Sequence, residues 1–152
     1  MDEPGETTIV ASFSKNSREM VCVGVSLWQG KRRLFVRLYA QTPEAKQPVP
    51  TKEGVTLPVE QYQALLEGVR ALAEAGGKEV VTAKIPKNKS QQVWVGANLY
   101  KEMPLLYIRT YAAFPGSQEL KPAKQGVSIR AELYPKLLEV VEKLGKALEE
   151  KV

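Results

Sequence analysis

The sequence predicts an α+β protein that contains two copies of one unit, a four-stranded antiparallel sheet followed by a helix. The 152-residue chain aligns with itself at an offset of roughly 72 residues, without gaps from Ile9 onward, and roughly a third of the aligned positions are identical. Each copy has segments of period-two alternation and ends in a segment with apolar residues every three or four positions. We therefore expect a disordered lead-in at residues 1–8, a first ββββα repeat at 9–76 and a second at 77–152.

A short strand motif occurs in both copies, as Leu34 to Tyr39 and again as Leu106 to Tyr111. In the first copy the alternation places Leu34, Val36 and Leu38 on one face, and an aromatic, an arginine and a second aromatic residue on the other. The aliphatic face requires a covering helix. Rings beside a guanidinium group are unusual on a solvent face, so this second face is expected to bind a partner.

The first copy should contain four strands and then a helix. The strands are expected at Thr8 to Phe13, Met20 to Trp28, Arg33 to Tyr39 and Glu53 to Leu57. A turn at Gln29 and Gly30 joins the second and third strands as a hairpin, and a proline-rich loop at residues 41–51 precedes the short fourth strand. Pro58 stands where the first turn of a helix accepts proline, and Gly76 with its following glycine ends that helix.

The second copy repeats this order. Its strands are expected at Val80 to Ile85, Gln92 to Tyr100, Leu105 to Tyr111 and Gly126 to Ile129, before a helix from about Ala131 to about Glu150. Each unit of about 70 residues is marginal alone. We therefore expect the two units to pack helix to helix as an intramolecular pseudo-dimer, a monomer with internal pseudo-twofold symmetry, with further self-association left open.

Composition narrows the possible functions. The formal net charge is +5, and the excess of positive charge lies in the strands and loops, which favours an anionic partner. Histidine is absent, Cys22 is the only cysteine and Asp2 the only aspartate, so no cofactor, metal site, catalytic residue or enzyme activity is expected. No apolar run reaches membrane-spanning length and the first residues do not resemble a secretion signal, which predicts a cytoplasmic protein without membrane association.

The face opposite the aliphatic residues collects most of the aromatic rings of both copies. Stacking rings, guanidinium groups and surrounding lysines suit single-stranded nucleic acid, whose bases stack while its phosphates meet the cations. The same rings could instead pack on each other as ordinary buried aromatics, and the residues alone leave both interpretations open. The candidate nucleic-acid-binding residues are Trp28, Lys31, Arg33, Phe35, Arg37, Tyr39, Lys52, Trp94, Tyr100, Lys101, Tyr107, Arg109, Tyr111, Lys121 and Lys124.

The second copy resembles the positive cofactor four family of transcriptional coactivators in two stretches, Ile108 to Tyr111 and Leu120 to Ile129, and in the helix after them. The resemblance implies a curved four-stranded antiparallel sheet followed by a helix, dimerisation and binding of single-stranded DNA. It covers each copy from its second strand through its helix.

The resemblance also implies roles for individual residues. The family's stacking aromatic before the first hairpin corresponds to Trp28 and Tyr100, and its strand arginine to Arg37 and Arg109. The lysines of its lysine-proline loop correspond to Lys121 and Lys124 in the second copy and to Lys52 alone in the first. A second stacking tryptophan of the family corresponds to Ala40 and Ala112, where Trp94, Phe35 or Tyr107 would have to substitute.

Single-stranded DNA is therefore the expected partner, bound with little sequence specificity in transcription regulation or DNA metabolism. Two alternatives stay open. One is a repeat protein of the purine-rich-element-binding type that takes single-stranded DNA or RNA, since stacking does not sense the 2′-hydroxyl. The other is a protein-interaction scaffold that uses the same aromatic face.

Overall fold

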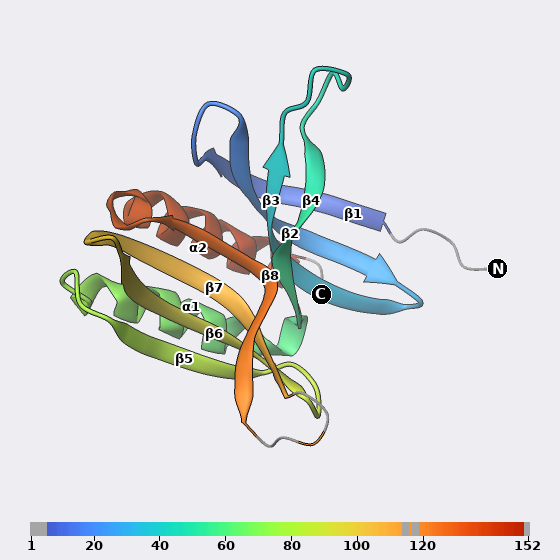
Figure 1. Cartoon of the computed structure of the whole chain (residues 1–152). Helices are drawn as coiled ribbons and strands as arrows, with labels where there is room; N and C mark the ends of the chain where they lie inside the picture. Colours follow the sequence, from blue (N-terminus) through green and yellow to red (C-terminus); the bar gives the residue numbers. More distant parts are fainter. Residues whose placement is uncertain (1–5, 114–115, 117–118, 151–152) are drawn as a thin grey trace.

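The computed structural model describes residues 6–113, 116 and 119–150, with the side chains of Trp28 and Glu150 outside the description (Figure 1). The chain forms two four-stranded antiparallel sheets, and each sheet is followed by a helix, which confirms the predicted α+β fold. The first sheet has the order β1 (Glu6–Ser14), β2 (Glu19–Trp28), β3 (Lys31–Ala40) and β4 (Val49–Pro58). The second has the order β5 (Val80–Pro86), β6 (Gln91–Tyr100), β7 (Met103–Ala113) and β8 (Leu120–Arg130).

The helices follow the sheets through short 3-10 turns. The first repeat ends with η1 (Val59–Gln61), α1 (Tyr62–Ala71) and η2 (Leu72–Glu74), and the second with η3 (Ala131–Leu133) and α2 (Tyr134–Glu150). Each α-helix presents one apolar stripe, with Leu65 and Val69 of α1 and Leu144 of α2 fully buried. No helix in the described part of the chain is long and apolar enough to cross a membrane.

Each helix packs against the sheet of the other repeat. Helix α1 contacts β5 and β6, whereas α2 contacts β1 and β2, and Figure 1 shows α1 behind the second sheet. The approach of α1 to β5 is close because Gly68 has no side chain, since a Cβ there would lie 2.7 Å from the Cβ of Ala83. The Thr82 hydroxyl on β5 donates a 2.7 Å hydrogen bond to the Gly68 carbonyl. Neither repeat therefore covers its own sheet.

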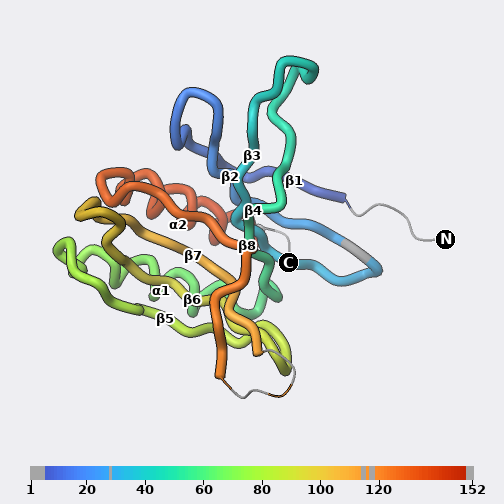
Figure 2. Tube along the Cα trace, in the orientation of Figure 1, coloured from blue at the N-terminus to red at the C-terminus, as the bar shows by residue number. Residues whose placement is uncertain are grey.

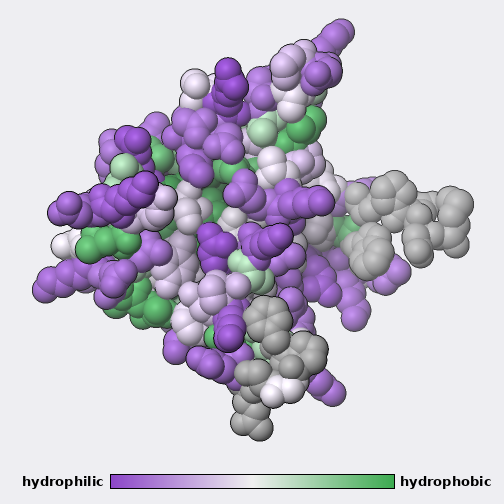
Figure 3. Space-filling view, in the orientation of Figure 1, coloured by the Kyte–Doolittle hydropathy of each residue, from purple (hydrophilic) through white to green (hydrophobic). Residues whose placement is uncertain are grey.

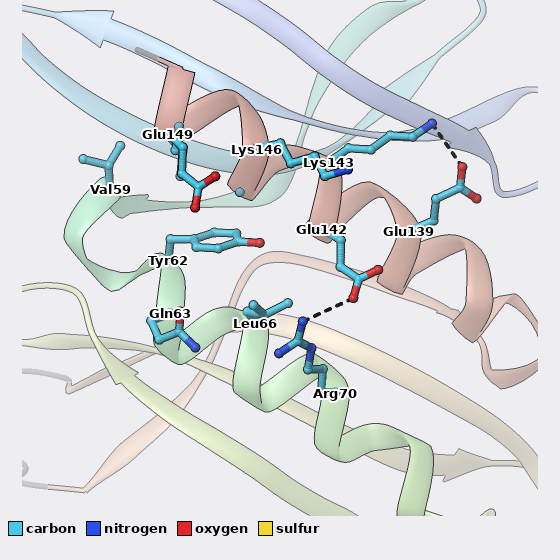
Figure 4. A pocket seen from close by; sticks show the side chains of 12 residues that line it. Val59, Tyr62, Gln63, Leu66, Arg70, Glu139, Glu142, Lys143, Lys146 and Glu149 are labelled. Carbon is cyan, nitrogen blue, oxygen red and sulfur yellow. Dashed lines mark hydrogen bonds and ion pairs between the residues drawn. The ribbon is translucent and has the colours of Figure 1, made fainter. Parts of the chain in front are cut away.

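The helices also contact each other, as the sequence predicts, and their contacts are reciprocal. The Tyr62 hydroxyl donates to the Val141 carbonyl (2.7 Å), and the Tyr134 hydroxyl donates to the Arg70 carbonyl (3.2 Å). Arg70 and Glu142, which occupy equivalent positions in the two repeats, form an exposed ion pair of 3.3 Å (Figure 4). This pair lies in an open groove of about 870 Å³ between the two helices.

One continuous core joins the two repeats. It contains Val36 and Leu65 from the first repeat and Val95 and Val141 from the second within a single cluster of buried side chains. At the centre of the molecule β4 packs against β8, and Figure 2 shows these two strands meeting there. The outer faces of both sheets point away from this core.

Two predicted boundaries need correction. Strand β1 begins at Glu6, because residues 6–8 pair with β2 opposite residues 25–27, so the disordered lead-in does not extend to residue 8; residues 1–5 lie outside the described residues. Strands β4 and β8 are also longer than predicted and include Pro50 and Pro122. Both are edge strands, where a missing backbone N–H costs no ladder hydrogen bond.

The hairpin turns differ between the repeats. Gln29 and Gly30 both have positive φ (51° and 75°), as a two-residue hairpin turn requires. At the equivalent turn of the second repeat Lys101 and Glu102 also have positive φ (50° and 67°) without any glycine. The second turn therefore keeps its conformation through the pairing of β6 with β7 and against the local preference of its residues.

The exchange of helices predicts the behaviour of a chain cut between Gly76 and Gly77. Each fragment retains a sheet without its helix cover, so neither should be stable as a monomer, and the two should reassociate into a folded 1:1 complex. Size-exclusion chromatography and thermal unfolding of the separate and mixed fragments measure this. We expect the mixed pair to unfold at a higher temperature than either fragment alone. Self-pairing of one fragment in the same arrangement would bring two Arg70 or two Glu142 side chains together. Separate fragments that unfold cooperatively as monomers would contradict the helix exchange.

Candidate nucleic-acid interface

The two strand arginines are fixed in the same way on the outer faces of the sheets. Arg109 on β7 lies opposite Gly126 on β8, where a Cβ would come within 2.9 Å of the arginine side chain, so the glycine lets the arginine cross the edge strand. Arg109 Nη1 donates to the Ala123 carbonyl at 3.1 Å, and Nη2 donates to Ser128 Oγ at 3.4 Å. Ala123 lies in the irregular part of β8, so Arg109 also supports this part of the edge strand.

Arg37 repeats this geometry in the first sheet. It lies opposite Gly54, and its Nη1 donates to the Thr51 carbonyl at 2.9 Å across the bulge of β4. Thr51 is fixed in turn, because its hydroxyl donates to the Leu38 carbonyl at 2.8 Å. Both arginines are half-buried, with the rest of each guanidinium group available to a ligand.

A stacked aromatic pair lies on the outer face of the second sheet. The rings of Trp94 on β6 and Tyr111 on β7 are parallel within 8°, with their centroids 3.8 Å apart. The Lys84 ammonium lies 4.3 Å from the Trp94 ring centroid, and Trp94 Nε1 donates to Gln92 Oε1 at 2.8 Å. Since Tyr111 covers one face of the indole, Lys84 occupies the other. Both rings are half-buried and retain contact with solvent.

Tyr107 supports this pair from within the sheet. Its ring lies over Gly96, where a Cβ would come 2.7 Å from the Tyr107 ring, and only 8% of the residue is exposed. Burial raises the pKa of the Tyr107 hydroxyl first, and the neighbouring Tyr111, to which it is hydrogen-bonded, raises it further. Tyr107 therefore positions Tyr111, and through Tyr111 it also positions Trp94.

A hollow of about 440 Å³ lies beside these side chains. Its lining combines two tyrosines, an arginine, a lysine and an amide: Asn98, Tyr107, Arg109, Tyr111, Pro122, Ala123 and Lys124. Helix α1 lies behind this sheet in Figure 1, so the outer face of the sheet is toward the viewer in Figure 3, where pale side chains run between hydrophilic ones. The second repeat thus brings rings and cations together around one concave surface.

The described side chains of the first repeat form no such open aromatic surface. Cys22 takes the position that Trp94 has in the second repeat, and it packs with Phe35, Tyr39 and Met20 in a small closed cluster. The exposed fractions of Cys22, Phe35 and Tyr39 are 2%, 3% and 8%. Phe35 covers Gly24 just as Tyr107 covers Gly96.

Three of the candidate residues are therefore more buried than the sequence analysis expected. Phe35, Tyr39 and Tyr107 have the predicted parity, but the rings of Phe35 and Tyr107 fill the space above cross-strand glycines, and Tyr39 packs with Phe35 and Cys22. A ring in this position contributes to packing and offers little surface to a base. The sequence left open whether the rings bind a ligand or pack as buried aromatics. These three pack as buried aromatics.

The remaining candidates lie around the two faces. Tyr100 is 60% exposed, with the Lys101 ammonium 5.4 Å from its ring centroid, but it lies roughly 20 Å along β6 from Trp94. Trp28 is in β2, and its side chain lies outside the described residues. Arg33 is half-buried, and the exposed lysines among the candidates are Lys31, Lys52, Lys101, Lys121 and Lys124.

Sequence reasoning missed Lys84, Gln92 and Asn98 as site residues. Lys84 reaches Trp94 because the two residues are directly paired across β5 and β6, and that register includes a bulge between Val81 and Ala83. Strand alternation could have placed Gln92 and Asn98 on the face of Trp94, because both lie an even number of residues from Trp94 in the same strand. Among the described residues no group of three or more cysteine or carboxylate side chains is arranged to hold a metal ion.

A twice-repeated ββββα unit with an outer sheet face of rings and cations defines a class of small sheet-based binding proteins. Residues 15–68 match the family model of the Transcriptional Coactivator p15 (PC4), so the first repeat carries a PC4 domain and the resemblance seen in the sequence is confirmed. The second repeat has the same order of strands and helix. A search of curated proteins finds no match to the chain.

The contacts of Arg109 predict an effect on stability. Arg109→Ala should lower the free energy of unfolding by about 1.5 to 3 kcal/mol, because the Ala123 carbonyl loses a charged hydrogen-bond donor. Urea unfolding measures this, with Lys124→Ala as the control, whose exposed side chain should change the free energy by less than about 0.5 kcal/mol. An equal free energy of unfolding for the two variants would contradict a structural role for Arg109.

The buried thiol predicts a loss of stability at alkaline pH. Burial raises the pKa of Cys22 from 9.0 to about 11, so the folded state favours the protonated thiol more than the unfolded state does. This contribution is complete below pH 9 and is lost as the pH rises through 11. Urea unfolding across this range should show a steeper decline for the native chain than for Cys22→Ala. If a thiol reagent labelled Cys22 in the folded chain below pH 9 as fast as in the urea-unfolded chain, the burial of Cys22 would be contradicted.

Proposed function

We propose that this protein binds single-stranded DNA with little sequence specificity and acts in transcription regulation or DNA metabolism by binding and not by catalysis. The observation that carries this proposal is the stacked pair of Trp94 and Tyr111 beside Arg109, at the edge of an open hollow. The PC4 domain at residues 15–68 supports a role in transcription coactivation. Residues of the second sheet make the main contacts with bases.

A base gains its stacking surface by displacing Lys84. The ammonium group of this exposed lysine occupies the free face of Trp94, and a flexible side chain can leave at low cost. An incoming base then stacks on the indole, while Lys84 moves to a phosphate of the same strand. Tyr111 holds the indole in place from the other side, so the platform is formed before the ligand arrives.

The phosphates of the strand contact the cations around the hollow. Arg109 keeps donors that its bonds to Ala123 and Ser128 do not use, and Lys121 and Lys124 are exposed on the neighbouring edge strand. Stacking accepts any base, and lysine contacts with phosphate carry no sequence information, which accounts for the weak specificity. Unpaired bases are required, because paired bases in a duplex cannot reach the indole face.

We further propose that the chain acts as a monomeric pseudo-dimer in the cytoplasm. The exchanged helices and the reciprocal bonds of Tyr62 and Tyr134 support an internal pseudo-twofold arrangement. The equivalent positions of Arg70 and Glu142 carry opposite charges, which favours pairing within one chain over pairing of identical copies. A cytoplasmic location is an inference from the sequence alone.

Fluorescence or anisotropy titration of the full chain with single-stranded DNA, single-stranded RNA and duplex DNA of equal length tests the proposal. Single-stranded DNA should bind at least about tenfold tighter than duplex, with a log-log salt slope of about −0.7 per phosphate contacted. Trp94→Ala should weaken binding by about 1 to 3 kcal/mol, which is roughly 5- to 150-fold. Tyr100→Ala is the matched control, because this exposed ring lies far from the hollow.

Two outcomes would reject single-strand binding. Equal affinity for duplex and single strand, or binding that does not respond to salt, would favour the protein-interaction scaffold. Loss of affinity in Tyr100→Ala but not in Trp94→Ala would place the stacking surface at the end of β6, where the family resemblance puts it. RNA bound as tightly as DNA would favour the alternative of a single-stranded DNA and RNA-binding repeat protein.

A further inference from the structure

The loop between β5 and β6 extends from the second repeat to the first. It is anchored there because the Gln61 side-chain amide, in η1 of the first repeat, donates a 3.0 Å hydrogen bond to the Pro86 carbonyl. The loop is also closed on itself, since Lys87 N donates to the Gln91 carbonyl (3.0 Å) and Asn88 Nδ2 donates to Gln91 Oε1 (2.8 Å). Lys87 therefore has a fixed place next to the first sheet.

Two arginines of β3 are close enough to Lys87 for their charges to act on it. The lysine is half-buried, and its pKa is lowered first by burial and then by the nearby charges of Arg33 and Arg37. Arg33 and Arg37 alternate with Phe35 along the outer face of the first sheet, so both point to the same side as the candidate ligand surface. Three cations from two repeats thus lie on one side of the first sheet, near enough for the charges of both arginines to act on Lys87.

This cation group has no carboxylate to neutralise it in the part of the chain that the structure describes. The ion pairs there involve Arg70, Arg130 and Lys143, and none includes a member of the group. Arg37 uses Nη1 for the Thr51 carbonyl, which leaves Nη2 for another acceptor. Like charges held together in a partly buried place are unfavourable unless an anion binds among them.

The equivalent junction on the second sheet has a different chemistry. The loop between β1 and β2 brings Lys15 to a hollow of about 500 Å³ lined by Leu105 and Ser128. Leu105 takes the position of Arg33, and the arginine that lines this hollow, Arg130, is paired with Glu132 at 4.0 Å. The second sheet has the open aromatic pair and the first sheet has the cation group, so the two faces have become chemically different.

We propose that Arg33, Arg37 and Lys87 form a phosphate-binding site across the two repeats, which holds the backbone of a nucleic-acid strand without contacting its bases. The identity of this ligand rests on the proposed function, since the same chain would bind bases at Trp94. Three donors around one position suit the tetrahedral oxygens of a phosphodiester, and the bound anion removes the repulsion within the group. Phe35 and Tyr39 are closed in one cluster with Cys22, so neither of these described rings offers a stacking surface on this face.

The test compares an abasic single-stranded oligodeoxynucleotide, which has phosphodiesters but no bases, with oligothymidylate of the same length. Lys87→Gln in the full chain should weaken binding of the abasic strand at least about fivefold and make the salt slope shallower by about 0.7. Lys15→Gln is the matched change at the other junction. It should change the affinity for the abasic strand by less than about twofold and leave the salt slope unchanged. Lys87→Arg should retain binding of the abasic strand, and Lys87→Gln should unfold at the same or a higher temperature, because it removes repulsion.

The outcomes separate this site from the proposed function. Equal effects of Lys87→Gln and Lys15→Gln, or an abasic strand that does not bind at all, would overturn the phosphate site, even if oligothymidylate still bound through Trp94. Binding of the abasic strand that needs Lys87, together with no effect of Trp94→Ala on oligothymidylate, would keep the phosphate site and reject base stacking. A Lys87→Gln chain that unfolds at a lower temperature, with Lys87→Arg also failing to bind, would make Lys87 a structural residue and overturn the site.

Discussion

The packing of each helix on the sheet of the other repeat is the constraint on which the rest of the structure depends. Because α1 covers β5 and β6 while α2 covers β1 and β2, neither apolar sheet face is shielded unless both repeats are present. One core results, which contains buried side chains from all eight strands and both helices. The outer faces are then left without helix cover, and they are the surfaces that a ligand can reach.

Glycine controls what those outer faces present. Gly24 and Gly96 leave space that the rings of Phe35 and Tyr107 fill, and Gly126 lets Arg109 cross the edge strand. The rings nearest a glycine are thus structural, and Tyr111, four residues further along β7 than Tyr107, is half-exposed. This explains why a face that is aromatic in both copies of the sequence keeps a half-exposed stacked pair at Trp94 and Tyr111, apart from the exposed ring of Tyr100.

Duplication within one chain permits differences that identical subunits cannot have. Arg70 faces Glu142 at equivalent positions, Cys22 replaces the ring of Trp94, and Leu105 replaces Arg33. Each difference is local, and none disturbs the common order of strands and helix. The two faces can therefore specialise, one in rings and the other in cations, while they share a single core.

The sequence by itself determined the duplication, the ββββα order and the inward face of each strand, because a period of two or of 3.6 residues is a local property of the chain. It also located Arg37 and Arg109 on the outer faces. Only the tertiary structure decided which helix covers which sheet, since an apolar stripe fits either sheet equally well. It also decided that Phe35 is buried while Trp94 is half-exposed, and that Lys87 reaches β3 of the other repeat. Those outcomes depend on contacts between residues far apart in the chain, and alternation within one strand contains no information about them.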